Sequence, residues 1–320
     1  MIRTIVLASV VFLVTVVGLY YFNNDEPKTE TIVLSQDSDP ATVRAYWKQE
    51  ILQNDSKTVY ESFKQVYKDD PNGAHAQAHT FGGLLYEILG MKGFTTCDSN
   101  FGYGCFHEFV TFAVVDRGII AIPELGEMCI NTPNDSDTFS CFHGIGHGLN
   151  QFNGNEKLID SLTQCGTLSD TTLSGSAEAC ESGVFMDYYV PISGEVKPAN
   201  EDTLYTPCDE ANLPVRFKNP CYFGLPHWWF MLETIPVRQV GVLCSESPEQ
   251  HRDQCYAGMG IDLPGRVGYN QQKIIQECQA LPDEDGTKSC LRVSADTLKS
   301  LGFEHCIVQK QFGSGLEDCV

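Results

Sequence analysis

Fourteen cysteines recur along this chain at regular intervals. Taken two at a time they form seven pairs, and each pair encloses a short polar loop. A longer and more apolar stretch separates one pair from the next. The pattern therefore repeats about every 36 residues, which is the length of a helical-hairpin repeat. The pairs are Cys97 and Cys105, Cys129 and Cys141, Cys165 and Cys180, Cys208 and Cys221, Cys244 and Cys255, Cys278 and Cys290, and Cys306 and Cys319.

This cysteine pattern indicates disulfides rather than metal clusters. No C-x-x-C motif occurs, and spacings of 8 to 15 residues across polar loops are typical of disulfides in an oxidising compartment. Pairing inside each loop uses every cysteine, whereas pairing Cys105 with Cys129, and so on along the chain, would orphan Cys97 and Cys319. Counting favours the loop pairing, although spacing alone allows either. Each bridge would stabilise the fold by about 2–4 kcal/mol, mainly by restricting the unfolded chain.

The amino-terminal segment predicts a membrane anchor. Residues 4–22 form an uncharged, mostly apolar run of 19 residues, long enough to cross a bilayer as a helix. Arg3 precedes the run, and Asp25 and Glu26 follow it. Because positive charge tends to stay inside, we expect a single-pass protein whose C-terminal domain lies outside the cytoplasm. A cleaved signal peptide is the alternative; the length of the run and the absence of small residues at its end favour an uncleaved signal-anchor.

The net charge of −21 limits the choice of partners. Such a chain should repel nucleic acid and should remain soluble. It could attract cations or basic proteins, but solvation of an exported domain is the simplest explanation of the charge.

The rest of the chain is organised as a helical array. We expect a transmembrane signal-anchor at 1–22, a polar and acidic stalk at 23–40, and an α-helical repeat domain of about seven cysteine-bounded units at 41–320. Amphipathic helices at 41–53 and 56–67 should precede the first unit. The predicted fold is therefore all-α: a disulfide-laced array of helical hairpins, either an α-solenoid or an α/α toroid-like ring, behind an N-terminal transmembrane helix.

Glycine recurs three residues after the opening cysteine in four units, as Gly144, Gly183, Gly224 and Gly258. Glycine inside a helix costs about 1 kcal/mol relative to alanine, so its recurrence at one position indicates a packing purpose. We expect it to let neighbouring helices approach closely. Close approach of a ligand to the backbone is the alternative.

Helical-hairpin units of this length, laced by regular disulfides, resemble the Sel1-like and tetratricopeptide solenoids, especially their cysteine-rich exported versions. The resemblance covers residues 73–320 and depends on period and cysteine placement. The C-[FY]-x-G element, as at 221–224, is not the consensus of either family. The resemblance implies an architecture and a concave face on which a protein partner could bind. It implies no catalytic residue.

Histidines follow the same repeat. Six of the eight histidines lie within seven residues after the opening of a unit, counted from the opening cysteine or, in the first unit, from Gly73. They occupy only two offsets, and equivalent offsets line up on one face of a stacked array. At an offset of two residues from the opening lie His75, His107 and His143. At an offset of six residues lie His79, His147 and His227.

This register predicts a metal site. The pairs 75/79 and 143/147 are spaced i, i+4, so both members of a pair point the same way along a helix. Imidazole is the commonest metal-binding side chain at neutral pH, and two such arms resemble half of a zinc or copper site. The two pairs should lie about 20 Å apart if neighbouring units stack near 10 Å, so one shared site would need a tightly curved array. Oxygen and sulfur donors at the same level are Glu108, Glu181, Met186, Asp187 and Asp262.

Three hypotheses of function follow. The first is a membrane-anchored, extracytoplasmic repeat protein that binds copper or zinc through the aligned histidines. The second is a non-enzymatic scaffold that binds a protein. The third is a metal-dependent hydrolase or oxidoreductase, with His107 and Glu108 as the weak catalytic candidates and His147 beside them. Histidines that only satisfy buried polar groups are the competing structural explanation.

Three further interpretations concern residues outside the two histidine offsets. Trp228 and Trp229 should belong to the core rather than to a ligand platform. We interpret His251, in an expected loop, and His305, in a terminal helix, as ordinary residues.

Overall fold

The structure is a computed structural model, and it is all-helical over the residues it describes. The expected membrane segment at 4–22 and nearly all of the stalk lie outside those residues. Among the helices described, none combines the length and apolarity that a membrane span requires. The described residues are 34, 38–68, 74–168, 175–190, 196–198, 200, 202–232, 235–312 and 319.

Two helices precede the repeats, as the sequence predicts. α2 spans Pro40–Gln53 and α3 spans Ser56–Tyr67. Each begins at an aspartate whose carboxylate accepts a hydrogen bond from the backbone amide three residues on, which satisfies one of the free amides at a helix start. Both helices bury aromatic side chains next to the first repeat. These rings are Trp47 and Phe63, which pack on Phe81.

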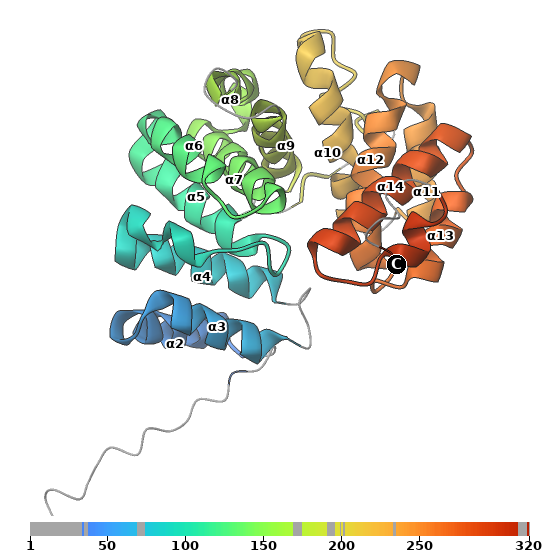
Figure 1. The fold of residues 1–320 in the computed structure, drawn as a ribbon. Coiled ribbons are helices and arrows are strands. Elements are labelled where there is room, and N and C mark those ends of the chain that lie inside the picture. Colours follow the sequence, from blue (N-terminus) through green and yellow to red (C-terminus); the bar gives the residue numbers. More distant parts are fainter. Residues whose placement is uncertain are drawn as a thin grey trace, which may run out of the picture. The chain divides into compact units, whose positions relative to one another are not determined.

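Each repeat contains a long first helix that packs on the first helix of the next repeat (Figure 1). These helices alternate with shorter second helices or turns. The first helices are α4 (His75–Leu89), α5 (Gly104–Arg117), α7 (Asp135–Asn153), α9 (Ser176–Tyr189), α10 (Lys218–Met231), α12 (Glu249–Arg266) and α14 (Glu284–Ser300). The second elements are η1 (Gly90–Thr96), η2 (Gly118–Ala121) with α6 (Ile122–Ile130), η3 (Asn155–Lys157) with α8 (Leu158–Cys165) and η4 (Gly166–Leu168), α11 (Val237–Glu246), α13 (Gln271–Gln279) and α15 (Cys306–Gln309).

Disulfides fasten each second element to the next first helix. All fourteen cysteines are paired inside the polar loops, with Cα–Cα distances between 5.4 Å and 5.7 Å. The loop pairing is thus confirmed, and the alternative pairing of Cys105 with Cys129 is wrong. Every first helix from α5 to α14 contains the cysteine that opens its unit, so six of the seven bridges tie a first helix to the segment before it.

The fourth unit replaces its second helix with an irregular segment, as the long polar stretch after α9 predicts. This segment runs to η5 (Val215–Phe217). Trp228 and Trp229 are buried, and their indole nitrogens donate to the carbonyls of Lys197 and Leu204. The tryptophan pair is therefore a core element that anchors the insertion.

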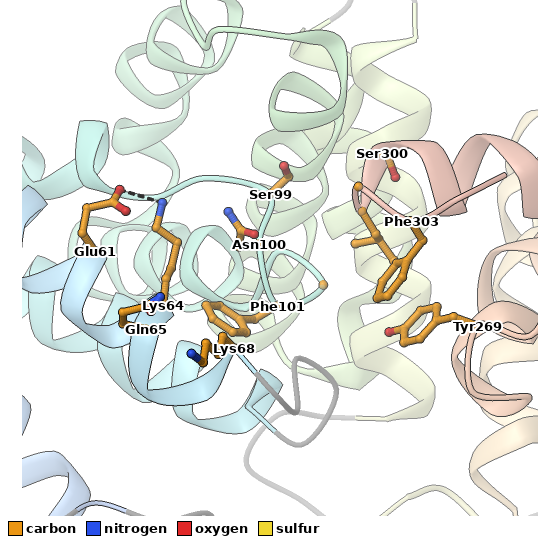
Figure 2. A pocket seen from close by; sticks show the side chains of 13 residues that line it. Glu61, Lys64, Gln65, Lys68, Ser99, Asn100, Phe101, Tyr269, Ser300 and Phe303 are labelled. Carbon is orange, nitrogen blue, oxygen red and sulfur yellow. Dashed lines mark ion pairs between the residues drawn. The ribbon is translucent and has the colours of Figure 1, made fainter. Parts of the chain in front are cut away.

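The first and last units of the array meet. The Tyr103 hydroxyl donates to Ser300 Oγ at 3.2 Å, although the two residues are 197 positions apart. A pocket of about 730 Å³ lies at this junction, between the loop before α5 and the residues after α14 (Figure 2). Phe101 borders it on one side, and the stacked rings of Tyr269 and Phe303 border it on the other. The sequence left open whether the array closes, and these contacts join its two ends.

Glycines bring the first helices unusually close. A Cβ atom at Gly183 of α9 would lie 1.9 Å from the carbonyl oxygen of His143, and one at Gly146 of α7 would lie 1.9 Å from that of Cys180. A Cβ at Gly258 would lie 2.0 Å from the carbonyl oxygen of Phe223. Real side chains do not approach carbonyl oxygens so closely. The packing purpose inferred from the glycine pattern is therefore confirmed at Gly183 and Gly258.

We expect Gly183→Ala to destabilise the protein by about 1–3 kcal/mol or more, because the added methyl group must push α9 away from α7. Urea unfolding measures this change. Gly166→Ala is the matched control, since a Cβ there would lie 3.4 Å from its nearest neighbour, the end of the flexible Arg216 side chain. Equal effects of the two substitutions would contradict the close approach of these helices.

Candidate metal centre

Three successive first helices each contribute histidines to one cluster. α4 provides His75 and His79, α5 provides His107, and α7 provides His143 and His147. The helices stack in register, so the side chains at equivalent offsets lie on the same side of the stack. Five of the six histidines singled out from the sequence thus come together.

The cluster consists of two triads that share one residue. His75, His79 and His107 form the first triad, and His107, His143 and His147 form the second. Within each triad, one ring nitrogen per residue lies within 4.8 Å of the others. The His107 ring centroid lies 5.1 Å from those of both His143 and His147. A neutral imidazole has one ring nitrogen with a free lone pair, so His107 is placed to serve either triad.

From stacking near 10 Å we expected the two histidine pairs to lie about 20 Å apart, which would keep them out of one cluster. That expectation is wrong. That estimate treated the intervening unit as a spacer, but His107 of that unit lies between the pairs. The glycines also shorten the distance between helices. A Cβ at Gly104 of α5 would lie 2.7 Å from the His75 carbonyl oxygen, and one at Gly144 of α7 would lie 3.2 Å from that of Phe106.

Hydrogen bonds fix the ring orientation of the first triad. His75 Nδ1 lies 2.7 Å from the carbonyl oxygen of Phe101, which only accepts, so this nitrogen donates. His79 Nδ1 lies 3.1 Å from the Glu108 carboxylate. With both protons on Nδ1, the two Nε2 atoms face each other at 3.0 Å with their lone pairs. In metal-bound histidines, the ring nitrogen that does not bind the metal characteristically donates to a carbonyl or a carboxylate in this way.

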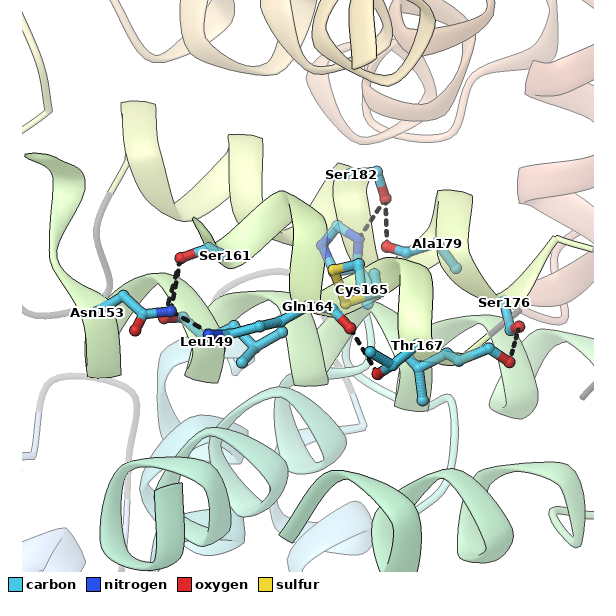
Figure 3. Close-up of a disulfide and its surroundings, with 12 residues drawn as sticks. Leu149, Asn153, Ser161, Gln164, Cys165, Thr167, Ser176, Ala179 and Ser182 are labelled. Carbon is cyan, nitrogen blue, oxygen red and sulfur yellow. Dashed lines mark hydrogen bonds between the residues drawn. A yellow bond between two sulfur atoms is a disulfide. The ribbon is translucent and has the colours of Figure 1, made fainter. Parts of the chain in front are cut away.

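In the second triad, one histidine ring is oriented by a hydrogen bond and another ring has no hydrogen-bond partner. His143 Nδ1 lies 2.8 Å from Ser182 Oγ, which itself donates to the carbonyl of Ala179 (Figure 3). Neither ring nitrogen of the buried His147 has a hydrogen-bond partner among the described residues. The nearest carboxylate, Asp187, is 3.7 Å from His147 Nδ1, too far for a hydrogen bond. A buried polar group without a partner calls for a ligand.

Burial favours the neutral form of three of the five histidines. Burial first, and then the charge of His79, lowers the pKa of His75 to about 3. Burial lowers the pKa of His107 and of His143 well below the ordinary value, and the charge of His147 adds to this effect in both cases. Neutral imidazoles have free lone pairs, which is the state that binds metal.

We expect the metal-free protein to lose stability on acidification. The pKa of histidine is about 6.5 in the unfolded chain, so between pH 6.5 and about 3 the unfolded state binds the extra proton and the folded state does not. His75 alone should account for about 2 kcal/mol of lost stability at pH 5. Urea unfolding of chelator-treated protein at pH 7.5 and pH 5 measures this loss, and His75→Phe should reduce it. An identical pH dependence in the variant would contradict the shift.

The Asp187 carboxylate lies beside the second triad. Asp187 accepts hydrogen bonds from Asn150 and Gln151. Burial acts to raise its pKa, but His147 and these two amides hold the pKa below its ordinary value. Asp187 is therefore a buried negative charge beside an imidazole, and a bound cation would balance it.

The remaining predicted donors lie apart from the two triads. His227 on α10 pairs instead with Asp262 on α12, at 2.8 Å, although its charge still acts on His75 and His143. Glu181 lies near Arg216 and Glu178, and burial, the largest effect, raises its pKa to about 7. None of His227, Asp262 and Glu181 belongs to either triad, and only His227 acts on the pKa values of the cluster.

The two histidines interpreted as ordinary do not join the cluster. His251 lies in α12 and not in a loop, so that expectation is wrong; it is buried, stacks on Tyr222 and bonds to Asn219. His305 immediately precedes the terminal helix and lies near Cys306 and Cys319. Those two sulfurs are joined in a disulfide and offer no thiolate.

Residues that the sequence reasoning missed include Phe101, through its carbonyl, and Ser182. Ser182 stands two residues after an opening cysteine, the offset that His143 occupies in the preceding unit. The repeat offset could therefore have predicted the position of Ser182. No sequence pattern predicts the position of the Phe101 carbonyl, because it depends on the loop that meets α4.

The donor geometry fits a transition metal ion. Two nitrogens bound at 2.0–2.1 Å to a tetrahedral zinc lie about 3.3 Å apart, close to the separation of the facing Nε2 atoms of His75 and His79. A third imidazole lies beside each pair. Comparisons with protein-family models, with curated proteins and with solved structures found no match to this chain.

Proposed function

We propose that this protein binds a transition metal ion, copper or zinc, through the cluster of His75, His79, His107, His143 and His147. The observation that carries the proposal is the pair of Nε2 atoms of His75 and His79, 3.0 Å apart with lone pairs facing. Without a proton on either nitrogen, two such acceptors do not attract each other at that distance. A shared cation turns the contact into an attraction, and the Nδ1 contacts have already oriented both rings for it.

The proposal includes a location. Fourteen cysteines in seven disulfides require an oxidising compartment, and the apolar run at 4–22 supplies a membrane anchor. The role would then be metal handling at the outer face of a membrane. Protease treatment of intact cells tests this location: the C-terminal domain should be digested, and its protection would contradict the topology.

Metal analysis of the purified, oxidised chain tests the binding itself. We expect copper or zinc in the purified protein, or tight uptake of either ion by the chelator-treated protein. The double variant His75→Ala/His79→Ala should bind metal only through the second triad, whereas His305→Ala, a histidine outside the cluster, should bind like the wild-type chain. Failure of the wild-type chain to bind either metal would end the proposal.

A further inference from the structure

A methionine stands beside the second triad. Met186 on α9 places its Sδ atom 3.4 Å from His143 Nε2 on α7. Met186 occupies the offset six residues after Cys180, which is the offset of His79 and His147 in their own units. The fourth unit therefore presents a thioether where two earlier units present an imidazole.

The contact between Met186 and His143 is not a hydrogen bond of the neutral imidazole. Ser182 Oγ donates its proton to the Ala179 carbonyl, so it accepts from His143 Nδ1, and the ring proton is on that nitrogen. His143 Nε2 then carries a lone pair, and a thioether has no proton to offer. Both atoms are electron donors that face each other, just as the two Nε2 atoms do in the first triad.

Sulfur changes the metal preference of the second triad. Thioether ligands favour soft ions such as Cu(I), whereas zinc in proteins takes imidazole, thiolate and carboxylate ligands. Three neutral imidazoles and a neutral thioether also add no charge to the ion. A monovalent cation is less costly to bury in such a site than a divalent one.

We propose that His107, His143, His147 and Met186 form a copper(I) site. This inference rests on the proposed function, since it assigns an ion to half of the same cluster. The thioether contact is made to His143, a member of the second triad only. Asp187, held as a carboxylate beside His147, would balance the single positive charge of the ion.

The test compares Met186→Leu with wild type in the full chain. Cu(I) affinity is measured anaerobically by competition with bicinchoninate in ascorbate, which keeps copper reduced, while structural disulfides resist mild reductants. Zinc affinity is measured by competition with a chromophoric chelator. We expect Met186→Leu to weaken Cu(I) binding at least about tenfold, the loss expected for one ligand, and to leave zinc affinity within about twofold. Met128→Leu, a partly exposed methionine on α6, is the matched control.

The outcomes separate this inference from the proposed function. If Met186→Leu binds Cu(I) as tightly as wild type, or loses copper and zinc equally, the copper(I) site is wrong while the histidine cluster remains a metal site. If the wild-type chain binds neither ion, both proposals fail. Copper K-edge absorption gives a second readout: a sulfur neighbour should be present in wild type and absent in Met186→Leu.

Discussion

Replacing His107 by phenylalanine is expected to weaken metal binding more than any other single histidine substitution. His107 belongs to both triads, so its loss leaves two imidazoles in each. Removing even an outer-shell partner typically costs 10- to 100-fold in metal affinity, and we expect more than about a hundredfold here. Phenylalanine has a ring of similar size, which keeps the buried position filled.

The comparison that makes this prediction sharp uses His75→Phe. That variant removes one member of the first triad only, so the second triad should still bind. Competition titrations with zinc and with Cu(I) should therefore show a loss of both ions for the His107 variant and a partial loss for the His75 variant. Wild-type affinity in His107→Phe would show that the two triads do not share a ligand.

Reduction of the disulfides is expected to unfold the repeat domain at 25 °C. Each bridge contributes about 2–4 kcal/mol, and seven of them together exceed the net stability of about 5–15 kcal/mol that is usual for a folded domain. Six of the bridges also tie a first helix to the segment before it, so their loss should disorder the histidine cluster. Far-UV circular dichroism during titration with a strong thiol reductant measures the unfolding.

A terminal bridge supplies the control for this prediction. Cys306 and Cys319 close only the last loop, whereas Cys165 and Cys180 join the unit that contains His143 and His147 to α9. Replacing the first pair by alanine should cost less stability than replacing the second pair, and it should leave metal affinity unchanged. A fully reduced chain that still melts cooperatively near the temperature of the oxidised protein would contradict the account.

The sequence predicts the fold well because its strongest signal is covalent. Pairing inside the loops uses every cysteine, which favours it over the pairing that would orphan Cys97 and Cys319, and the loop pairing then sets the repeat. Helix boundaries were harder to predict. α7 begins at Asp135, capped by Asn134, well before the opening Cys141, and α12 begins at Glu249, which places His251 in a helix. Both helices begin six residues before the opening cysteine of their unit, inside the polar loop.

The sequence predicts which residues join the histidine cluster better than it predicts the geometry of that cluster. Register alone placed His75, His107 and His143 on a common face, because repeated offsets face the same way. The closeness of the helices was not predictable in detail, since it depends on which carbonyl oxygen each glycine meets. The separate pairing of His227 with Asp262 was not predictable either, because it depends on how α10 and α12 turn relative to α7.

The most direct measurement is anomalous X-ray diffraction from crystals of the oxidised protein, recorded at the zinc and copper absorption edges. The account predicts a peak within bonding distance of the Nε2 atoms of His75 and His79, or of the His143 ring, with His107 as a neighbour. The contradicting result is an absence of anomalous density at both triads in crystals soaked with each metal, with a proton shared between the two Nε2 atoms instead.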